Sequence, residues 1–239
     1  MVYIKFGTVS TPKLLSLSAY AESPILSVYF IDVGQGDATL ILSGDSAMLV
    51  DTGPDGGLSA LRDRLDASSV DQIDYLVLTH PHEDHDANLA YLADNYAKAY
   101  LVMPEYADDE EDYGSLLREM VSAGTQIVYP NVGDQYAIGK AIATVLSAPD
   151  PGQFPTDENL WSLVIRVDCC ETSVMLTGDA EDINEFAMID AGLLQHDQRR
   201  AGERLGVQSC RNREGERTQP VPILQVPTGA DALRGQALF

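Results

Sequence analysis

The sequence predicts a mixed α/β domain, and three observations support this. From Ile25 onward, short β-rich runs alternate with segments whose apolar residues recur at helical spacing. Gly, Pro and Asp residues separate these segments, as is typical of turns. The 239-residue chain is 45% hydrophobic and 22% charged, the composition of a globular protein with a sizeable core. No apolar run approaches the ~20 residues of a transmembrane helix.

The first half of the pattern alternates strands with amphipathic helices. Leu58, Leu61 and Leu65 are spaced as one face of a helix, and Leu89 and Leu92 repeat such a spacing further on. The elements expected there are, in order, strands at 25–33, 38–42 and 47–53, a helix from 58 to 65, a strand at 75–79, a helix from 89 to 96, a strand at 99–104 and a helix at 113–124.

The second half predicts mostly strands. They are expected at 126–129, 134–138, 141–147, 160–168 and 172–177, followed by a helix at 181–192. After His196 the periodicity ends and Arg, Glu and Gly are abundant, which is typical of loops or disorder. The chain is therefore divided into a leader (1–26), a folded domain (27–198) and a diverged, loop-rich tail (199–239). A reading-frame change in the source gene is an alternative origin for the tail.

The net charge argues against a general nucleic-acid-binding surface. It is −22, and a polyanion needs a basic footprint on the protein. Residues 199–239 hold 7 of the 15 Lys and Arg, so the rest of the chain is more acidic still. Nucleic acid is a disfavoured partner on this ground, and a small hydrolysable substrate is favoured.

The N-terminal segment carries a weak export signal. Ala19-Tyr20-Ala21 has the A-x-A form of a signal-peptidase site, but the apolar stretch before it is short and rich in Ser. This pattern favours a cytoplasmic protein over a secreted one, with residues 1–26 as a poorly ordered leader.

The most informative stretch is "LTHPHEDHDAN", residues 78–88, which contains three of the four histidines in the chain. On an extended segment that leaves a strand, His80 and His82 point the same way, because side chains repeat every two residues. Two neutral imidazoles on one side form a nitrogen pair for a divalent metal. Asp84 and His85, on the turn that follows, can face a second metal. A solvated polar turn that caps the next helix is the alternative interpretation.

These motifs together resemble the metallo-β-lactamase superfamily. H-x-H-x-D-H follows a hydrophobic strand, with "LVDTG" upstream and "VMLTGDAE" downstream. Within that superfamily, "FIDVGQGDATLIL" and the later Asn159-x-x-Ser162-Leu163-Val164 resemble ComEC-type competence and DNA-uptake proteins. The likeness spans roughly residues 27–195. It implies a four-layer α/β/β/α sandwich with a nuclease-like site on the loops at one edge of the two sheets.

The resemblance also implies a role for each residue of the site. The implied metal ligands are His80 and His82 for a first ion, Asp84 and His85 for a second, and Asp179 as a bridge between them. Asp51 would accept a hydrogen bond from a ligating histidine and fix its tautomer. Asp84, supported by Asp51, is the implied catalytic residue. The implied cofactor is one or two Zn²⁺ or Mn²⁺ ions. Asp37 is expected to shape its turn rather than to bind metal.

Two departures from the superfamily pattern concern histidines that bind metal. No histidine lies between His85 and His196, although many members have one there; ComEC-type sequences often lack it. Near the C-terminus, "ILQVPTGADAL" has Thr228-Gly229 where the pattern has a His-His-Gly-Ser-like turn. We therefore expect less than full occupancy of two metal positions.

The resemblance implies a metal-dependent hydrolase in which a metal-bound hydroxide attacks a phosphodiester. Two alternatives remain open at this point. The same hydroxide can hydrolyse a carboxylic ester or a lactone. A degenerate domain with weak or no catalysis is the other alternative, because a missing imidazole leaves the acidic cluster mutually repulsive.

Overall fold

The structure, a computed structural model, describes residues 3–4, 25–106 and 111–194. All of them belong to the first of two compact units, Met1–Glu203. Within this unit the strands form two sheets. The first has six strands in the order β2 (Ser27–Phe30), β3 (Thr39–Ser43), β4 (Ser46–Val50), β5 (Gln72–Val77), β6 (Ala97–Val102) and β7 (Gln126–Val128). Its first three strands pair antiparallel, and β4 to β7 pair in parallel.

The second sheet has five strands, all paired antiparallel. Their order is β1 (Tyr3–Ile4), β11 (Thr172–Leu176), β10 (Val164–Cys169), β9 (Ala141–Ser147) and β8 (Gln135–Ile138). Strand β1 lies in the expected leader and was not predicted. It pairs with β11, with Tyr3 opposite Met175.

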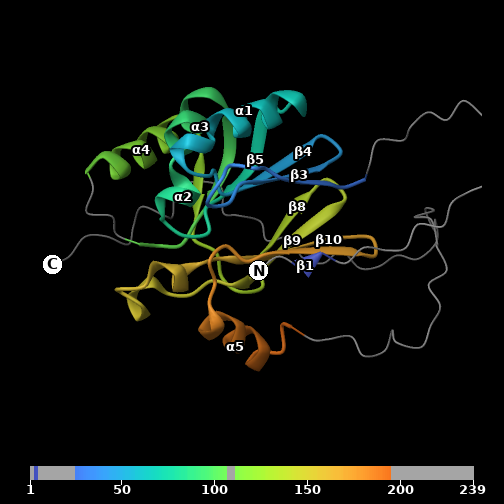
Figure 1. Cartoon of the computed structure of the whole chain (residues 1–239), viewed down its shortest axis with the longest axis vertical. Helices are drawn as coiled ribbons and strands as arrows, with labels where there is room; N and C mark the ends of the chain where they lie inside the picture. Colours follow the sequence, from blue (N-terminus) through green and yellow to red (C-terminus); the bar gives the residue numbers. More distant parts are fainter. Residues whose placement is uncertain (1–2, 5–24, 107–110, 195–239) are drawn as a thin grey trace, which may run out of the picture. The chain divides into compact units, whose positions relative to one another are not determined.

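Helices cover the outer faces of both sheets, which gives the predicted four-layer sandwich (Figure 1). Helices α1 (Leu58–Ala67), α3 (Leu89–Asn95) and α4 (Glu111–Ser122) lie on the six-stranded sheet, and α5 (Asp182–Asp190) lies on the other sheet. The short α2 (Glu83–Asp86) and three 3-10 helices, η1 (Asp55–Gly57), η2 (Pro151–Gln153) and η3 (Glu158–Trp161), lie in connections between these elements.

Strand alternation divides the core into an inner and an outer part. Val77 and Val102 face the second sheet, in a cluster that also contains Val145 and Ile165. Their chain neighbours, such as Leu76, face the helices α1, α3 and α4 instead. Consecutive residues of a strand point to opposite faces, so β5 and β6 are buried on both sides, as is usual for parallel strands.

The predicted strand at 160–168 is wrong at its beginning. Residues 158–161 form η3, and the strand starts only at Val164. Leu160 and Trp161 are buried like strand residues, so an apolar run alone could not distinguish the two conformations. The tail 199–239, His196 and most of the leader lie outside the described residues. Among the described helices, none combines the length and apolar character needed to cross a membrane.

Candidate metal centre

Loops from both sheets meet at one edge of the sandwich. Strands β4 and β5 are parallel, so their carboxyl ends lie side by side and present Asp51 and the segment Thr79–His85. Strand β11 of the other sheet ends just before Asp179. The backbone N–H of Leu163, which leads into β10, donates to the carbonyl of Thr79 at 3.0 Å and joins the two sheets at this edge.

His80, His82 and Asp179 lie together. Nε2 of His80 is 3.0 Å from Nδ1 of His82 and 3.9 Å from Oδ2 of Asp179. One ligand-type atom from each of the three lies within 4.8 Å of the others. His80 is buried, whereas the His82 and Asp179 side chains are 39% and 43% exposed. A buried imidazole beside two accessible ligand groups forms a site that opens toward solvent on one side.

His85 connects this group to Asp51. Its Nδ1 lies 3.0 Å from Oδ2 of Asp51, and its Nε2 lies 3.5 Å from Oδ1 of Asp179. Asp51 also accepts hydrogen bonds from the backbone N–H and the hydroxyl of Thr79, both at 2.8 Å. The Asp51 carboxylate therefore contacts His85 on the side of the ring opposite Asp179; the family resemblance implied a contact of Asp51 with a ligating histidine.

The loops after β4 and β5 are tied to each other. The backbone N–H of Thr52 donates to the carbonyl of His85 at 2.6 Å. The Asn88 amide donates to the carbonyls of Thr52, Gly53 and Pro54 at 2.8–3.0 Å. Asn88 is buried, so these bonds are shielded from water. The two loops form one hydrogen-bonded unit.

Burial and neighbouring charges shift the pKa values of the site in opposite directions. Burial and the nearby His85 and His82 lower the pKa of His80 to about 3. Burial would also lower the pKa of His85. The hydrogen bond and charge of Asp51, with the charges of Asp179 and Asp84, outweigh it and raise the value to about 9. Burial raises the pKa of Asp51, and its hydrogen bonds with His85 and Thr79 oppose that rise.

In protein stripped of metal by a chelator, we expect the free energy of unfolding to fall as the pH rises from about 6.5 to about 9. The pKa of His85 is about 9 in the folded protein and about 6.5 in the unfolded chain. Its contribution is complete below the lower value and is lost as the pH passes through the upper one. Urea unfolding across this window measures the slope, and His85→Gln should flatten it. A wild-type stability that does not change over this window would contradict the assignment.

The other acidic residues near the centre lie around these imidazoles. Asp84 is half-buried and accepts from Nε2 of Gln35 at 3.4 Å; it is not in the group formed by His80, His82 and Asp179. Asp37 forms a second group with Asp51 and His85, their ligand-type atoms again within 4.8 Å of one another. The carboxylate of Asp37 therefore lies near His85, whereas the sequence predicted only that Asp37 shapes its turn.

Sequence reasoning did not find Glu158. Its Oε2 lies 3.2 Å from Nε2 of His82. In the sequence, Glu158 is only an acidic residue four positions before Ser162, just ahead of an expected strand. Because η3 was not predicted, the sequence did not indicate that the Glu158 side chain lies near His82.

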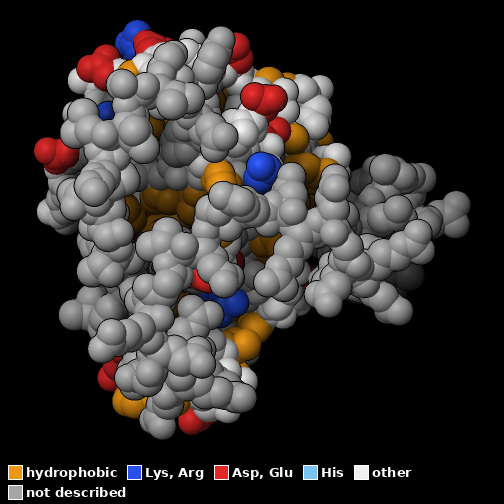
Figure 2. All heavy atoms as spheres, turned by 90° about the vertical axis from the view of Figure 1, so that its right-hand side faces the viewer, with side chains coloured by type: hydrophobic (Ala, Val, Ile, Leu, Met, Phe, Trp, Pro, Cys, Tyr) orange, Lys and Arg blue, Asp and Glu red, His pale blue; other side chains and the backbone are white. Residues whose placement is uncertain are grey.

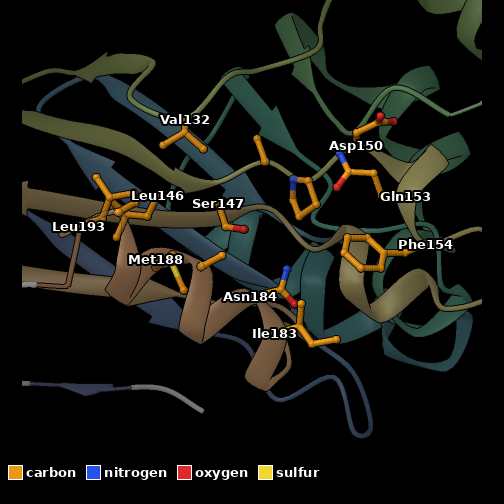
Figure 3. Close-up of a pocket in the computed structure, with 14 residues that line it drawn as sticks. Val132, Leu146, Ser147, Asp150, Gln153, Phe154, Ile183, Asn184, Met188 and Leu193 are labelled. Atoms are coloured by element: carbon orange, nitrogen blue, oxygen red, sulfur yellow. The ribbon is translucent and has the colours of Figure 1, made fainter.

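A small pocket lies at the edge of this centre, with Asp37, Asp51 and Gly178 in its lining, and a larger hollow lies away from it. A mostly apolar hollow of about 370 Å³ lies between the end of β9 and α5, with Leu146, Phe154 and Met188 in its lining (Figure 3). None of the histidines or Asp179 lines it. Among the described side chains visible in Figure 2, Lys and Arg are scattered and form no continuous patch.

The residues of the centre fit a divalent cation. The Thr79 hydroxyl gives its only hydrogen to Asp51, so toward His80 it can only accept, which requires a hydrogen on Nδ1 of His80. Nε2 of His80 then presents a lone pair beside His82 and Asp179. Imidazole nitrogens with a carboxylate are the donor set of Zn²⁺ and related ions.

Comparison with known proteins gives the same family as the motifs. The family model of the metallo-beta-lactamase superfamily matches residues 31–218. Recombination protein 2 of Haemophilus influenzae is 29% identical over 184 residues, which cover 75% of this chain and 21% of that protein. ComE operon protein 3 of Bacillus subtilis is 30% identical over 196 residues, which cover 70% of this chain and 24% of that protein.

The chain thus spans less than a quarter of the length of these two curated relatives, both ComEC-type competence proteins. Among solved structures, the metallo-beta-lactamase fold protein YhfI from Bacillus subtilis is 20% identical, with a TM-score of 0.42 and coverage of 62% of this chain and 59% of that one. The resemblance expected from the motifs is confirmed. The chain belongs to the metallo-β-lactamase superfamily.

Proposed function

We propose that this protein is a metal-dependent hydrolase of phosphodiesters. The observation that carries the proposal is the orientation and hydrogen bonding of the imidazole rings. His80 and His85 each direct Nε2 toward Asp179, while Nδ1 of each has a hydrogen-bond partner behind it. A hydrogen-bond partner on the ring nitrogen that does not face the metal is typical of histidines that bind metal, because it fixes the tautomer and the ring orientation.

The residues that would hold Zn²⁺ or Mn²⁺ are His80, His82, His85 and Asp179, with Asp84 beside them. A bound ion of this kind lowers the pKa of water toward ~7 and so supplies a nucleophile at neutral pH. Asp51 keeps a hydrogen on Nδ1 of His85 and leaves Nε2 for the centre. Asp84 supplies a carboxylate beside the centre that can hold the proton released by water.

The charge and the relatives together favour a short or single-stranded nucleic acid as the substrate. The net charge of −22 disfavours a long duplex, which needs many basic contacts. A bound divalent ion supplies positive charge only at the centre, which suffices for one or two phosphates. Similarity to competence proteins supports a phosphodiester over an ester or a lactone.

We expect metal-dependent cleavage of bis(p-nitrophenyl) phosphate by the chelated and then reloaded protein. Activity should rise with added Mn²⁺ or Zn²⁺ and fall by about 100-fold or more in His82→Ala and Asp84→Ala. Asp71→Ala, an exposed Asp before β5, is the matched control and should retain full activity. Unchanged turnover in both site variants would remove this centre from consideration. Hydrolysis of p-nitrophenyl acetate without diester cleavage would instead favour an esterase.

A further inference from the structure

One short segment contacts two candidate ligands from outside the centre. It begins with Glu158, the first residue of η3, and ends with Ser162, which follows the helix directly. Oε2 of Glu158 lies 3.2 Å from Nε2 of His82, and Oγ of Ser162 lies 3.4 Å from Nδ1 of His80. The nitrogens that face each other across the centre are the other two, Nε2 of His80 and Nδ1 of His82, at 3.0 Å.

This segment is held firmly in place. Trp161 is buried, its ring packs on Tyr106 with centroids 5.6 Å apart, and its Nε1 donates to the carbonyl of Phe154 at 2.8 Å. The next backbone bond, from Leu163 to the carbonyl of Thr79, fixes the segment to the loop that carries the histidines. The position of the Glu158 backbone relative to His82 is therefore set by the fold.

The contacts of His82 favour one placement of its hydrogen. A carboxylate attracts an N–H group and repels a nitrogen lone pair, so Oε2 of Glu158, 3.2 Å from Nε2 of His82, favours a hydrogen on that nitrogen. The neutral ring then has its lone pair on Nδ1, directed at the lone pair on Nε2 of His80. Without a metal, a hydrogen on one of the two nitrogens makes their 3.0 Å contact a hydrogen bond, whereas a metal ion between them requires a lone pair on both. Ligand bonds of ~2.0–2.1 Å in a tetrahedral site place two nitrogens about 3.3 Å apart, close to the observed spacing.

We propose that Glu158 is a positioning residue for His82, fixing the tautomer that directs Nδ1 into the metal centre. This inference rests on the proposed function, because it concerns the same centre. Glu158 acts through His82 and does not itself hold the ion: its carboxylate faces the nitrogen that points away from His80. The arrangement repeats on the exposed side of the centre what Asp51 does for His85 on the buried side.

The test measures zinc affinity and the ring protons of His82 in the full chain. Glu158→Ala should weaken zinc binding by about 10–100-fold, the usual effect of losing such a partner. It should also remove the slowly exchanging Nε2–H signal of His82 from the ¹⁵N NMR spectrum of the zinc-loaded protein. Glu158→Gln keeps an acceptor oxygen and should retain that signal. Glu171→Gln, the same charge change at an exposed turn residue, should change the affinity by less than about twofold.

Two results would overturn the positioning role. The first is zinc affinity of Glu158→Ala equal to that of the wild type. The second is a change in the visible absorption of the Co²⁺ form of Glu158→Ala that indicates a lost ligand, which would make Glu158 a ligand itself. His82→Ala separates this inference from the proposed function. If His82→Ala abolishes binding while Glu158→Ala does not, only the role of Glu158 is lost. If His82→Ala also binds normally, the centre itself is wrong.

Discussion

Replacing Asp51 by Asn should lower zinc affinity by about 100-fold while leaving the protein folded. Asp51 accepts three hydrogen bonds, two from Thr79 and one from His85. An amide oxygen can still accept from the Thr79 backbone, but the NH₂ group then faces Nδ1 of His85. That nitrogen must become an acceptor, so the hydrogen moves to Nε2, the nitrogen directed at Asp179. The ligand lone pair is lost without any change in side-chain size.

Asp74→Asn is the matched control for this substitution. Asp74 also accepts a backbone hydrogen bond, from Ala47 at 2.9 Å, but it makes no contact with the centre. Its variant should bind zinc normally. Titration calorimetry gives the affinities, and ¹⁵N ring shifts report the tautomer of His85. Wild-type affinity in Asp51→Asn, with the hydrogen of His85 still on Nδ1, would remove Asp51 from the mechanism.

Gly36→Ala should destabilise the protein by about 3 kcal/mol and disrupt metal binding. Gly36 has φ +97°, and a Cβ there would lie 2.0 Å from the backbone oxygen of Asp84. Backbone atoms cannot rotate away, so the loop that carries Asp84 and His85 has to move. Gly36→Ala therefore both strains the backbone at residue 36 and displaces the loop that carries Asp84 and His85.

Two other glycines separate these effects. Gly34 has φ +88°, but a Cβ there meets nothing within 4 Å among the described residues, so Gly34→Ala should cost only about 1–2 kcal/mol and leave metal binding intact. At Gly139 a Cβ would lie 2.0 Å from the backbone oxygen of Ser43, away from the centre. Gly139→Ala should lose stability without losing metal affinity once folded. Equal metal affinities in Gly36→Ala and Gly34→Ala would show that the close approach to Asp84 does not matter.

The sequence predicted the part of the site that depends on local spacing. His80, His82 and His85 lie within six positions, and their placement after a buried strand was enough to bring them to one edge. Asp51 and Asp179 could be added only through the family resemblance, because they lie 128 positions apart in the sequence (179 − 51) and no local rule joins them. The structure brings both against His85.

The parts that were not predicted depend on tertiary contacts. Strand β1 has only two residues and pairs with a strand about 170 positions away, so it has no periodicity to detect. The 3-10 helix that presents Glu158 is stabilised by the packing of Trp161 against Tyr106 and by the bond between Leu163 and Thr79. Without knowledge of those contacts, an apolar run of these residues predicts a strand.

The hydrogen-bonded unit formed by Thr52, His85 and Asn88 has a consequence for how substrate enters. That unit makes the half of the centre built on the six-stranded sheet a fixed platform, since moving either loop breaks several buried bonds at once. The opposite half contributes Asp179, which is 43% exposed and follows the end of β11 in the five-stranded sheet. In the proposed hydrolase, adjustment to substrates of different size then comes from the loop that carries Asp179, while the buried histidines stay in place.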